Sequence, residues 1–349
     1  MLGEHRRVLA RVWRARVERE LSLPCPVVAV GGATLGGSGK TPLAIACTRE
    51  LALAGVQATL VGHAYHAVTQ GPRFVHPGDR IEDVGDEALV AARVLQGLAR
   101  ARVAVAPRRG RAMTFAARSS EVLVLDGVAQ TRPVRAALAL LAVDAEDPWG
   151  RAEPLRALAS VRDGSMRQAP TATLLRACDA VVPMLDVDGP GAREATERTL
   201  ARFGELGRPV WPAFVHSRGA WVGQSLLTWE ALRTRRVGLV TALARPERVV
   251  RSLERRGLAP VAIVSARDHG PLGLVARLRA KAITRAGTVD LWVATGKCAL
   301  HAARALPRDV PLAVLDHTVI LDPALEVRLR GVGRLVSGPV STRVASHAP

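Results

Sequence analysis

Residues Ala29 to Ala44 read AVGGATLGGSGKTPLA, a run with five glycines. The short apolar run PVVAV leads into it, and the run LAIACTRELALAG that leaves it has helical spacing. The glycines are therefore predicted to lie at a turn from a strand into a helix. A phosphate-binding P-loop requires that context, so the sequence predicts a nucleotide-binding α/β domain.

The loop departs from the strict pattern G-x-x-x-x-G-K-[ST], because Thr34 stands where the first glycine is expected. Its chemistry is retained, since backbone N–H groups can point at phosphate oxygens, a lysine can neutralise them and a threonine can coordinate Mg²⁺. A purely structural glycine turn is the alternative. The predicted nucleotide-binding residues are Thr34, Gly36, Gly37, Ser38, Gly39, Lys40 and Thr41.

Composition narrows the class of partner. The net charge of +18 suits an anionic partner such as nucleic acid, a lipid surface or a phosphorylated substrate. Aromatic residues make up only 3% of the 349, and no zinc-finger or RNP pattern appears, so nucleic acid is not expected. The four cysteines are far apart and form no C-x-x-C motif, which fits a reducing compartment such as the cytoplasm.

The first 22 residues predict a basic amphipathic helix. Leu9, Val12, Trp13, Val17 and Leu21 recur at helical spacing among several arginines. Such a helix can lie in the headgroup region of a membrane, or it can pack on its own domain, and the sequence leaves both readings open. No apolar run here is long enough to span a bilayer.

Beyond the loop, strand-like and helix-like runs alternate, which predicts a P-loop NTPase-like, mostly parallel sheet with helices on both faces. The tryptophan-rich stretch from Pro209 to Leu232 is taken as the crossing into a smaller α/β domain. The predicted domains are residues 23–212, which form the P-loop domain, and residues 213–349, which form the smaller one. At 349 residues, two domains of unequal size are expected.

Several polar residues follow or precede these elements. Asp126 ends the apolar run EVLVLD, where a carboxylate can bind a metal near the phosphates, although a turn role in Asp-Gly is the alternative. Asp86 and Glu87 open a helix, so helix capping competes with a catalytic role. His269 follows the run PVAIVSA, and a solvated loop histidine is its alternative.

The order of these motifs carries a resemblance. TLGGSGKTP, then GDE, then a strand ending in Asp-Gly, then PLR, and then DH after a later strand resembles the tetraacyldisaccharide 4'-kinase family. The likeness runs from about Pro24 to Lys297, and its most specific part is the T-x-GG-x-GKTP loop, which accounts for Thr34. The resemblance implies an ATP-dependent enzyme of lipid A biosynthesis that phosphorylates the 4' hydroxyl of a membrane-bound, acylated glucosamine disaccharide. It also implies peripheral attachment to an anionic lipid surface at the cytoplasmic face of the inner membrane.

The resemblance further implies roles for individual residues. Lys40 and Thr41 serve ATP and Mg²⁺, and Asp86 is the base that takes the hydroxyl proton, oriented by His269. The implied catalytic set is therefore Asp86, His269 and Lys40, the metal set is Thr41, Asp126 and Glu87, and the substrate candidates are Tyr65 and Arg156.

This chain also departs from the family pattern. Leu125 replaces one aspartate of the family's DDG-x-QH segment, RGYGG has become HAYHA, and TEKD reads TGKC at Thr295 to Cys298. One acidic metal ligand is thus absent from its usual position, and Glu87 or a water is expected to compensate. Two other functions stay open: a P-loop ATPase or GTPase regulator, and a degenerate, non-catalytic paralogue.

Overall fold

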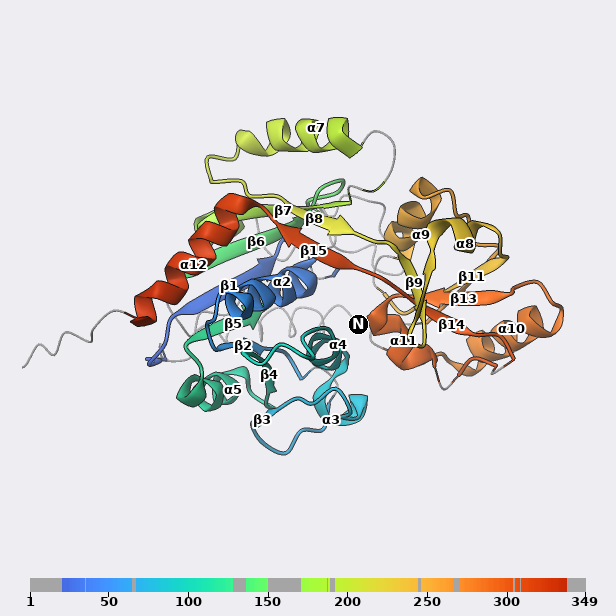
Figure 1. Ribbon diagram of the computed structural model, residues 1–349, viewed down its shortest axis with the longest axis horizontal. Helices are drawn as coiled ribbons and strands as arrows, with labels where there is room; N and C mark the ends of the chain where they lie inside the picture. The colour runs from blue at the N-terminus through green and yellow to red at the C-terminus, as the bar shows by residue number, and fades with distance from the viewer. Residues whose placement is uncertain are drawn as a thin grey trace, which may run out of the picture.

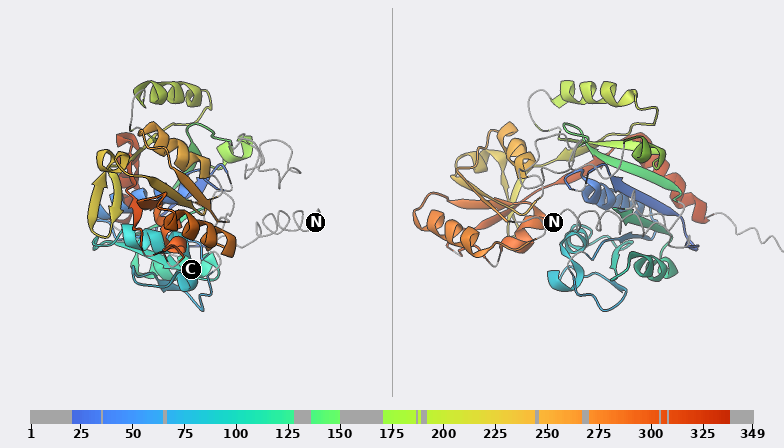
Figure 2. Two further views of the ribbon diagram at one scale, coloured as in Figure 1. Left: turned by 90° about the vertical axis from the view of Figure 1, so that its right-hand side faces the viewer. Right: turned by 180° about the vertical axis from the view of Figure 1, so that it is seen from behind.

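The chain forms two α/β units, each built on its own sheet (Figure 1). The computed structural model describes residues 21–34, 36–64, 67–127, 136–149, 171–186, 188, 192–243, 246–266, 270–303, 305–307 and 309–337. Viewed from behind, the two units still lie side by side, with the larger one holding both the N-terminal strands and the last helix (Figure 2). The predicted helix over residues 1–22 lies almost entirely outside the described residues.

The larger unit contains a nine-stranded sheet in the order β15-β8-β7-β6-β1-β5-β2-β4-β3. Only its two edge strands, β15 and β3, run antiparallel to their neighbours. The strands are β1 (Val27–Gly32), β2 (Ala58–Val61), β3 (Arg73–Phe74), β4 (Ala101–Val105), β5 (Val122–Asp126), β6 (Leu138–Asp144), β7 (Ala180–Asp186), β8 (Ala213–His216) and β15 (Thr318–Leu321).

Helices cover both faces of this sheet, as predicted. Side chains that alternate along a strand point to opposite faces, so Val28 packs toward one set of helices and Val27 toward the other. One face is covered by α2 (Lys40–Leu53), α4 (Asp86–Val94) and α12 (Pro323–Ser337). The other face is covered by α5 (Arg109–Ala116), α6 (Thr171–Arg176) and α7 (Ala192–Gly204). Two short helices, α3 (Ile81–Val84) and η2 (Ala117–Ser119), complete the unit.

The smaller unit contains a six-stranded sheet in the order β10-β9-β14-β13-β11-β12. Its strands are β9 (Gly219–Val222), β10 (Ser225–Thr228), β11 (Val237–Thr241), β12 (Ala262–Ser265), β13 (Leu291–Ala294) and β14 (Leu312–Leu315). The four strands β12, β11, β13 and β14 are parallel. Its helices are α8 (Trp229–Arg233), α9 (Pro246–Arg255), α10 (Leu274–Arg285) and α11 (Gly296–Ala302), which form one apolar core on each face of the sheet.

The two sheets divide the chain differently from the predicted boundary at residue 212. β8 still belongs to the larger sheet, and β15 returns to pair with it after the smaller sheet is complete. α12 then packs its buried leucines into the core beneath α2. The prediction missed this return because an edge strand is identified by its partner, and that partner lies about a hundred residues away in the sequence.

Candidate active site

The predicted P-loop connects β1 to α2, as the sequence indicated. Gly37 and Gly39 have φ angles of +72° and +83°, a backbone region that favours glycine. A Cβ at Gly39 would also lie 2.6 Å from Cγ of Met184. Because glycine at the N-cap has no side chain, the first N–H groups of α2 remain available to phosphate oxygens.

Thr34 contributes a contact within the phosphate loop. Its side chain is buried, and its hydroxyl donates a hydrogen bond to the Gly36 carbonyl at 2.6 Å. Thr34 therefore stabilises the loop through its buried side chain, whereas the residues from Gly36 to Thr41 line the adjoining cavity. The hydrogen bond to Gly36 gives the Thr34 hydroxyl a partner at a position where the usual pattern has glycine.

Asp126 lies beside Thr41 at the carboxyl end of β5. The Thr41 hydroxyl donates a hydrogen bond of 2.6 Å to Asp126 Oδ2, and within the described part of the chain Oδ1 has no hydrogen-bond partner. Burial and the negative charge of Glu87 raise the pKa of the Asp126 carboxyl to about 6, although Lys40, the Thr41 hydroxyl and Arg109 act against this rise. A buried carboxylate held above its ordinary pKa with an orphaned oxygen is suited to a cation.

Two of the three predicted magnesium ligands, Thr41 and Asp126, are in direct contact. A hydroxyl and a carboxylate at the phosphate loop are the donor set that Mg²⁺ takes together with nucleotide phosphates and waters. Among the described residues, no group of three His, Cys, Asp or Glu side chains forms a metal site by itself. Thr41 and Asp126 fit the metal, and the charge of Glu87 acts on the same carboxylate.

Asp86 is the first residue of α4, and its carboxylate meets a helix of the other domain. The distance from Asp86 Oδ2 to His301 Nε2 is 3.0 Å, and the distance to Lys297 Nζ is 4.0 Å. The Asp86 side chain is only 4% exposed. The same lysine lies 3.9 Å from Glu87 Oε1. Asp86 is thus a buried acid that contacts a histidine and lies near a lysine, both supplied by α11.

His301 was not predicted at this position. The sequence reasoning gave Asp86 a different partner, His269, which lies outside the described residues, as do Tyr65 and Arg156. A local signal for His301 exists, because Lys297 and His301 are four residues apart in a helical run and therefore share one face. The sequence does not predict that α11 packs against α4, where Gly296 lies close to Val90.

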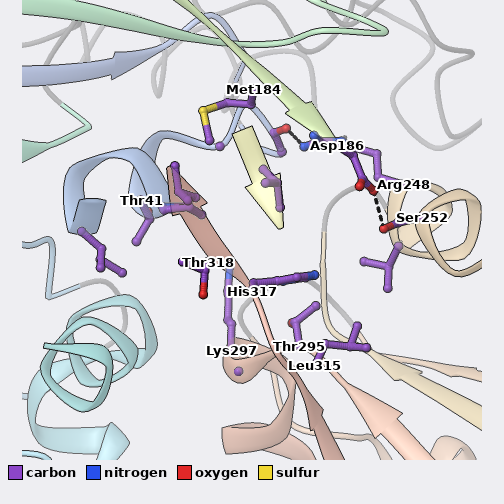
Figure 3. A pocket seen from close by; sticks show the side chains of 18 of the residues that line it. Thr41, Met184, Asp186, Arg248, Ser252, Thr295, Lys297, Leu315, His317 and Thr318 are labelled. Carbon is purple, nitrogen blue, oxygen red and sulfur yellow. Dashed lines mark hydrogen bonds between the residues drawn. The ribbon is translucent and has the colours of Figure 1, made fainter. Parts of the chain in front are cut away.

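A cavity of about 660 Å³ opens between the two domains. Figure 3 shows Thr41 and Met184 of the larger domain on one side and Thr295 and Lys297 of the smaller domain on the other. Arg248 of α9 reaches across to the Gly37 carbonyl and the Asp144 carboxylate. The phosphate loop and Glu87 of α4 therefore share one cavity with basic side chains from the smaller domain, and Asp86 is buried next to Glu87.

A second set of contacts holds α9 against the ends of the central strands. Arg256 donates hydrogen bonds to Asp186 at 2.8 Å and 2.5 Å and to Asp188 at 2.7 Å, and the Ser252 hydroxyl donates to Asp186 at 2.7 Å. Burial raises the pKa of the Asp186 carboxyl, but the hydrogen bonds from Arg256, Ser252 and Arg255 outweigh it and hold the pKa at about 2. This cluster links α9 of the smaller domain to the end of β7 beside the cavity, and Figure 3 shows its hydrogen bond between Ser252 and Asp186.

Comparison with known proteins places this site in a family. The family model described as tetraacyldisaccharide-1-P 4'-kinase matches residues 3–332. The chain belongs to this family. The predicted resemblance and the predicted P-loop kinase fold are therefore confirmed.

Individual relatives agree with the assignment. A tetraacyldisaccharide 4'-kinase of Anaeromyxobacter dehalogenans (strain 2CP-C) is 32% identical over 252 residues, which cover 70% of this chain and 64% of that protein. A tetraacyldisaccharide 4'-kinase of Dinoroseobacter shibae is 30% identical over 338 residues, which cover 91% and 92%. A crystal structure of LpxK from Aquifex aeolicus in complex with ATP has a TM-score of 0.61 at 18% identity, covers 93% of each chain and supports the fold.

Proposed function

We propose that this protein is an ATP-dependent kinase that transfers the γ-phosphate to the 4' hydroxyl of a tetraacylated glucosamine disaccharide 1-phosphate. The observation that carries the proposal is the meeting, at one cavity, of a phosphate-binding loop, Glu87 and Lys297 of the other domain. Asp86 is adjacent to Glu87, and its Oδ2 lies 4.0 Å from Nζ of the same lysine. Family membership supplies the acceptor class.

The residues have distinct roles in this reaction. Lys40 and the N–H groups of Gly36 to Gly39 bind the β- and γ-phosphates. Thr41 and Asp126 would hold Mg²⁺, which would neutralise charge on the phosphates. Asp86 accepts the proton of the acceptor hydroxyl as its oxygen forms a bond to the γ-phosphorus, and the bond to the β–γ bridging oxygen breaks to release ADP.

His301 and Lys297 keep Asp86 suited to act as a base. His301 hydrogen-bonds the buried carboxylate at 3.0 Å and the Lys297 ammonium lies 4.0 Å from it, and only an ionised carboxylate can accept a proton. The hydrogen bond from His301 also fixes the direction of Oδ2. The predicted role of His269 toward the same carboxylate remains a prediction.

The direct test is transfer of labelled γ-phosphate from ATP to a tetraacylated disaccharide 1-phosphate in mixed micelles. We expect Asp86→Asn to lower turnover by about two to four orders of magnitude while ATP still binds. Asp83→Asn, the same change three residues away in the short helix before α4, is the matched control and should leave turnover unchanged. Lys40→Ala should abolish transfer in a folded protein, because the phosphate charge then lacks its counter-charge.

The outcome also separates the alternative functions. ATP hydrolysis that is indifferent to the glycolipid would support a P-loop regulator, and intact ATP binding with no transfer would support a non-catalytic paralogue. Near-normal turnover of Asp86→Asn would remove Asp86 from the reaction, and a helix-start role costing about 1 kcal/mol of stability would then suffice.

The acceptor lipid also implies a membrane partner, and we propose peripheral attachment to anionic lipid at the cytoplasmic face of the inner membrane. Among the described residues, no helix is long and apolar enough to cross a bilayer. The basic amphipathic pattern of residues 1–22 supports the proposal, together with the net charge of +18.

A further inference from the structure

Helix α10 exposes an apolar stripe at the outer end of the smaller domain (Figure 1). Leu274, Val275 and Leu278 are 73%, 79% and 58% exposed. The opposite side of the helix packs inward through Ala280 and Thr284, which are buried. Three large apolar side chains within five residues are thus left uncovered by the described part of the chain.

Basic residues flank this stripe. Arg277, Arg279, Lys281 and Arg285 are all exposed, and α10 contains no acidic residue. At 100° per residue, the three apolar side chains fall within an arc of about 100°, with Arg277 and Lys281 on one side of it and Arg279 on the other. Long basic side chains in those positions can extend to anionic headgroups while the apolar side chains enter the acyl boundary.

This combination selects one class of partner. Nucleic acid would use the basic residues but gains nothing from leucine and valine, and α10 has no aromatic side chain for stacking. An acidic protein surface would leave the apolar stripe without a matching partner. We infer that α10 is a membrane-docking surface that binds an anionic lipid bilayer through Leu274, Val275 and Leu278.

The position of α10 in the fold agrees with this role. It follows β12, and the parallel strand β13, which is separated from β12 by β11 in the sheet, leads directly into Thr295 and Lys297 at the cavity. The carboxyl ends of parallel strands lie at one edge of a sheet, so the chain leaves β12 at the edge that faces the cavity before it reaches α10. The role of α10 specifies which surface makes the membrane contact proposed above, and it rests on that proposal.

Another helix with exposed apolar side chains provides a matched control. α12 exposes Val327 and Leu335, at 67% and 70%, but these lie eight residues apart, and Arg330 of that helix is paired with Glu326 at 3.2 Å. We therefore compare Leu274→Ser/Val275→Ser/Leu278→Ser on α10 with Val327→Ser/Leu335→Ser on α12. All five positions are exposed, so both variants are expected to fold, which circular dichroism and thermal unfolding verify.

The experiment is co-sedimentation of the full chain with vesicles of phosphatidylcholine containing phosphatidylglycerol, and with vesicles of phosphatidylcholine alone. We expect the α10 variant to bind the anionic vesicles on the order of tenfold more weakly, and the α12 variant to bind like the wild type. Arg279→Gln/Lys281→Gln/Arg285→Gln should reduce the salt dependence of binding. Binding of the α10 serine variant equal to the wild type would overturn the inference.

Activity separates this inference from the proposed function. In detergent micelles, the α10 serine variant should phosphorylate the acceptor at the wild-type rate, because its substitutions lie outside the cavity. Failure of the wild type to bind either vesicle overturns both the membrane contact and the role of α10. Wild-type binding to vesicles without phosphate transfer overturns the kinase proposal alone.

Discussion

Replacing Asp126 by asparagine should stabilise the metal-free protein while it removes a magnesium ligand. Burial and Glu87 raise the pKa of this carboxyl from 3.8 to about 6, so its ionised form is disfavoured in the folded state. This rise of about two pKa units lowers the free energy of unfolding of the wild type by about 3 kcal/mol at pH 7.5, relative to a carboxyl with its ordinary pKa. Asparagine keeps the shape and an oxygen that can accept from the Thr41 hydroxyl, but it carries no charge.

The gain in stability of Asp126→Asn over the wild type should increase with pH. A group whose folded pKa is raised binds more protons when folded, so the wild type loses stability as pH rises from about 4 to about 6. The stability difference between Asp126→Asn and the wild type should therefore be small at pH 4 and reach about half its final value at pH 5. Above about pH 7 it should level off near 3 kcal/mol.

Urea unfolding of both proteins in the presence of a chelator, at pH 5 and at pH 7.5, measures this difference. Mg²⁺ with ATP should then raise the unfolding midpoint of the wild type far more than that of Asp126→Asn, since only the wild type offers a carboxylate ligand. A variant that is less stable than the wild type at pH 7.5, or a stability difference that does not change with pH, would refute the reasoning.

Two further predictions concern the loop and the interdomain cluster. Gly39→Ala should weaken ATP binding at least tenfold in calorimetric titration, because the added Cβ meets Met184. Gly55 also has a positive φ but faces open space, so Gly55→Ala should leave ATP affinity unchanged and cost roughly 1 kcal/mol of stability. Arg256→Ala should cost about 3 kcal/mol in urea unfolding, because Asp186 and Asp188 lose their main buried partner. Arg256→Lys should recover only part of that loss, since lysine cannot reproduce the forked contacts, and equal stability of all three proteins would show that the cluster contributes nothing.

The local part of the site could be predicted from the sequence. A glycine run between an apolar strand and a helix places Lys40 and Thr41 with little influence from distant residues. Asp126 could be predicted for the same reason, since it ends a buried strand that lies next to the strand before the loop. In a parallel sheet these two strand ends meet at one edge, so the pairing of Thr41 with Asp126 follows from the order of the elements.

The part that depends on how two domains meet could not be predicted. His301 lies 215 residues from Asp86 in the sequence, and a helix face with a lysine and a histidine is compatible with many partners. The role of Arg248 could not be predicted either, because this residue belongs to a strongly amphipathic surface helix in a chain rich in arginine. Only the packing of α11 on α4 and of α9 on the strand ends selects these basic side chains from the others.

The site and the interdomain interface are therefore one structure, and this determines how variants of it are to be interpreted. The larger domain presents acids, such as Asp86 and Asp186, and the smaller domain supplies the bases that face them, such as His301 and Arg256. Removing a base takes one partner from a buried acid, so a variant can lose turnover through the reaction, through domain placement or through both. The two causes separate when turnover and unfolding are measured together. Arg256 contacts Asp186 and Asp188, so its variant should lose stability first. His301→Asn should lose turnover with little change in unfolding, because Lys297 remains beside Asp86.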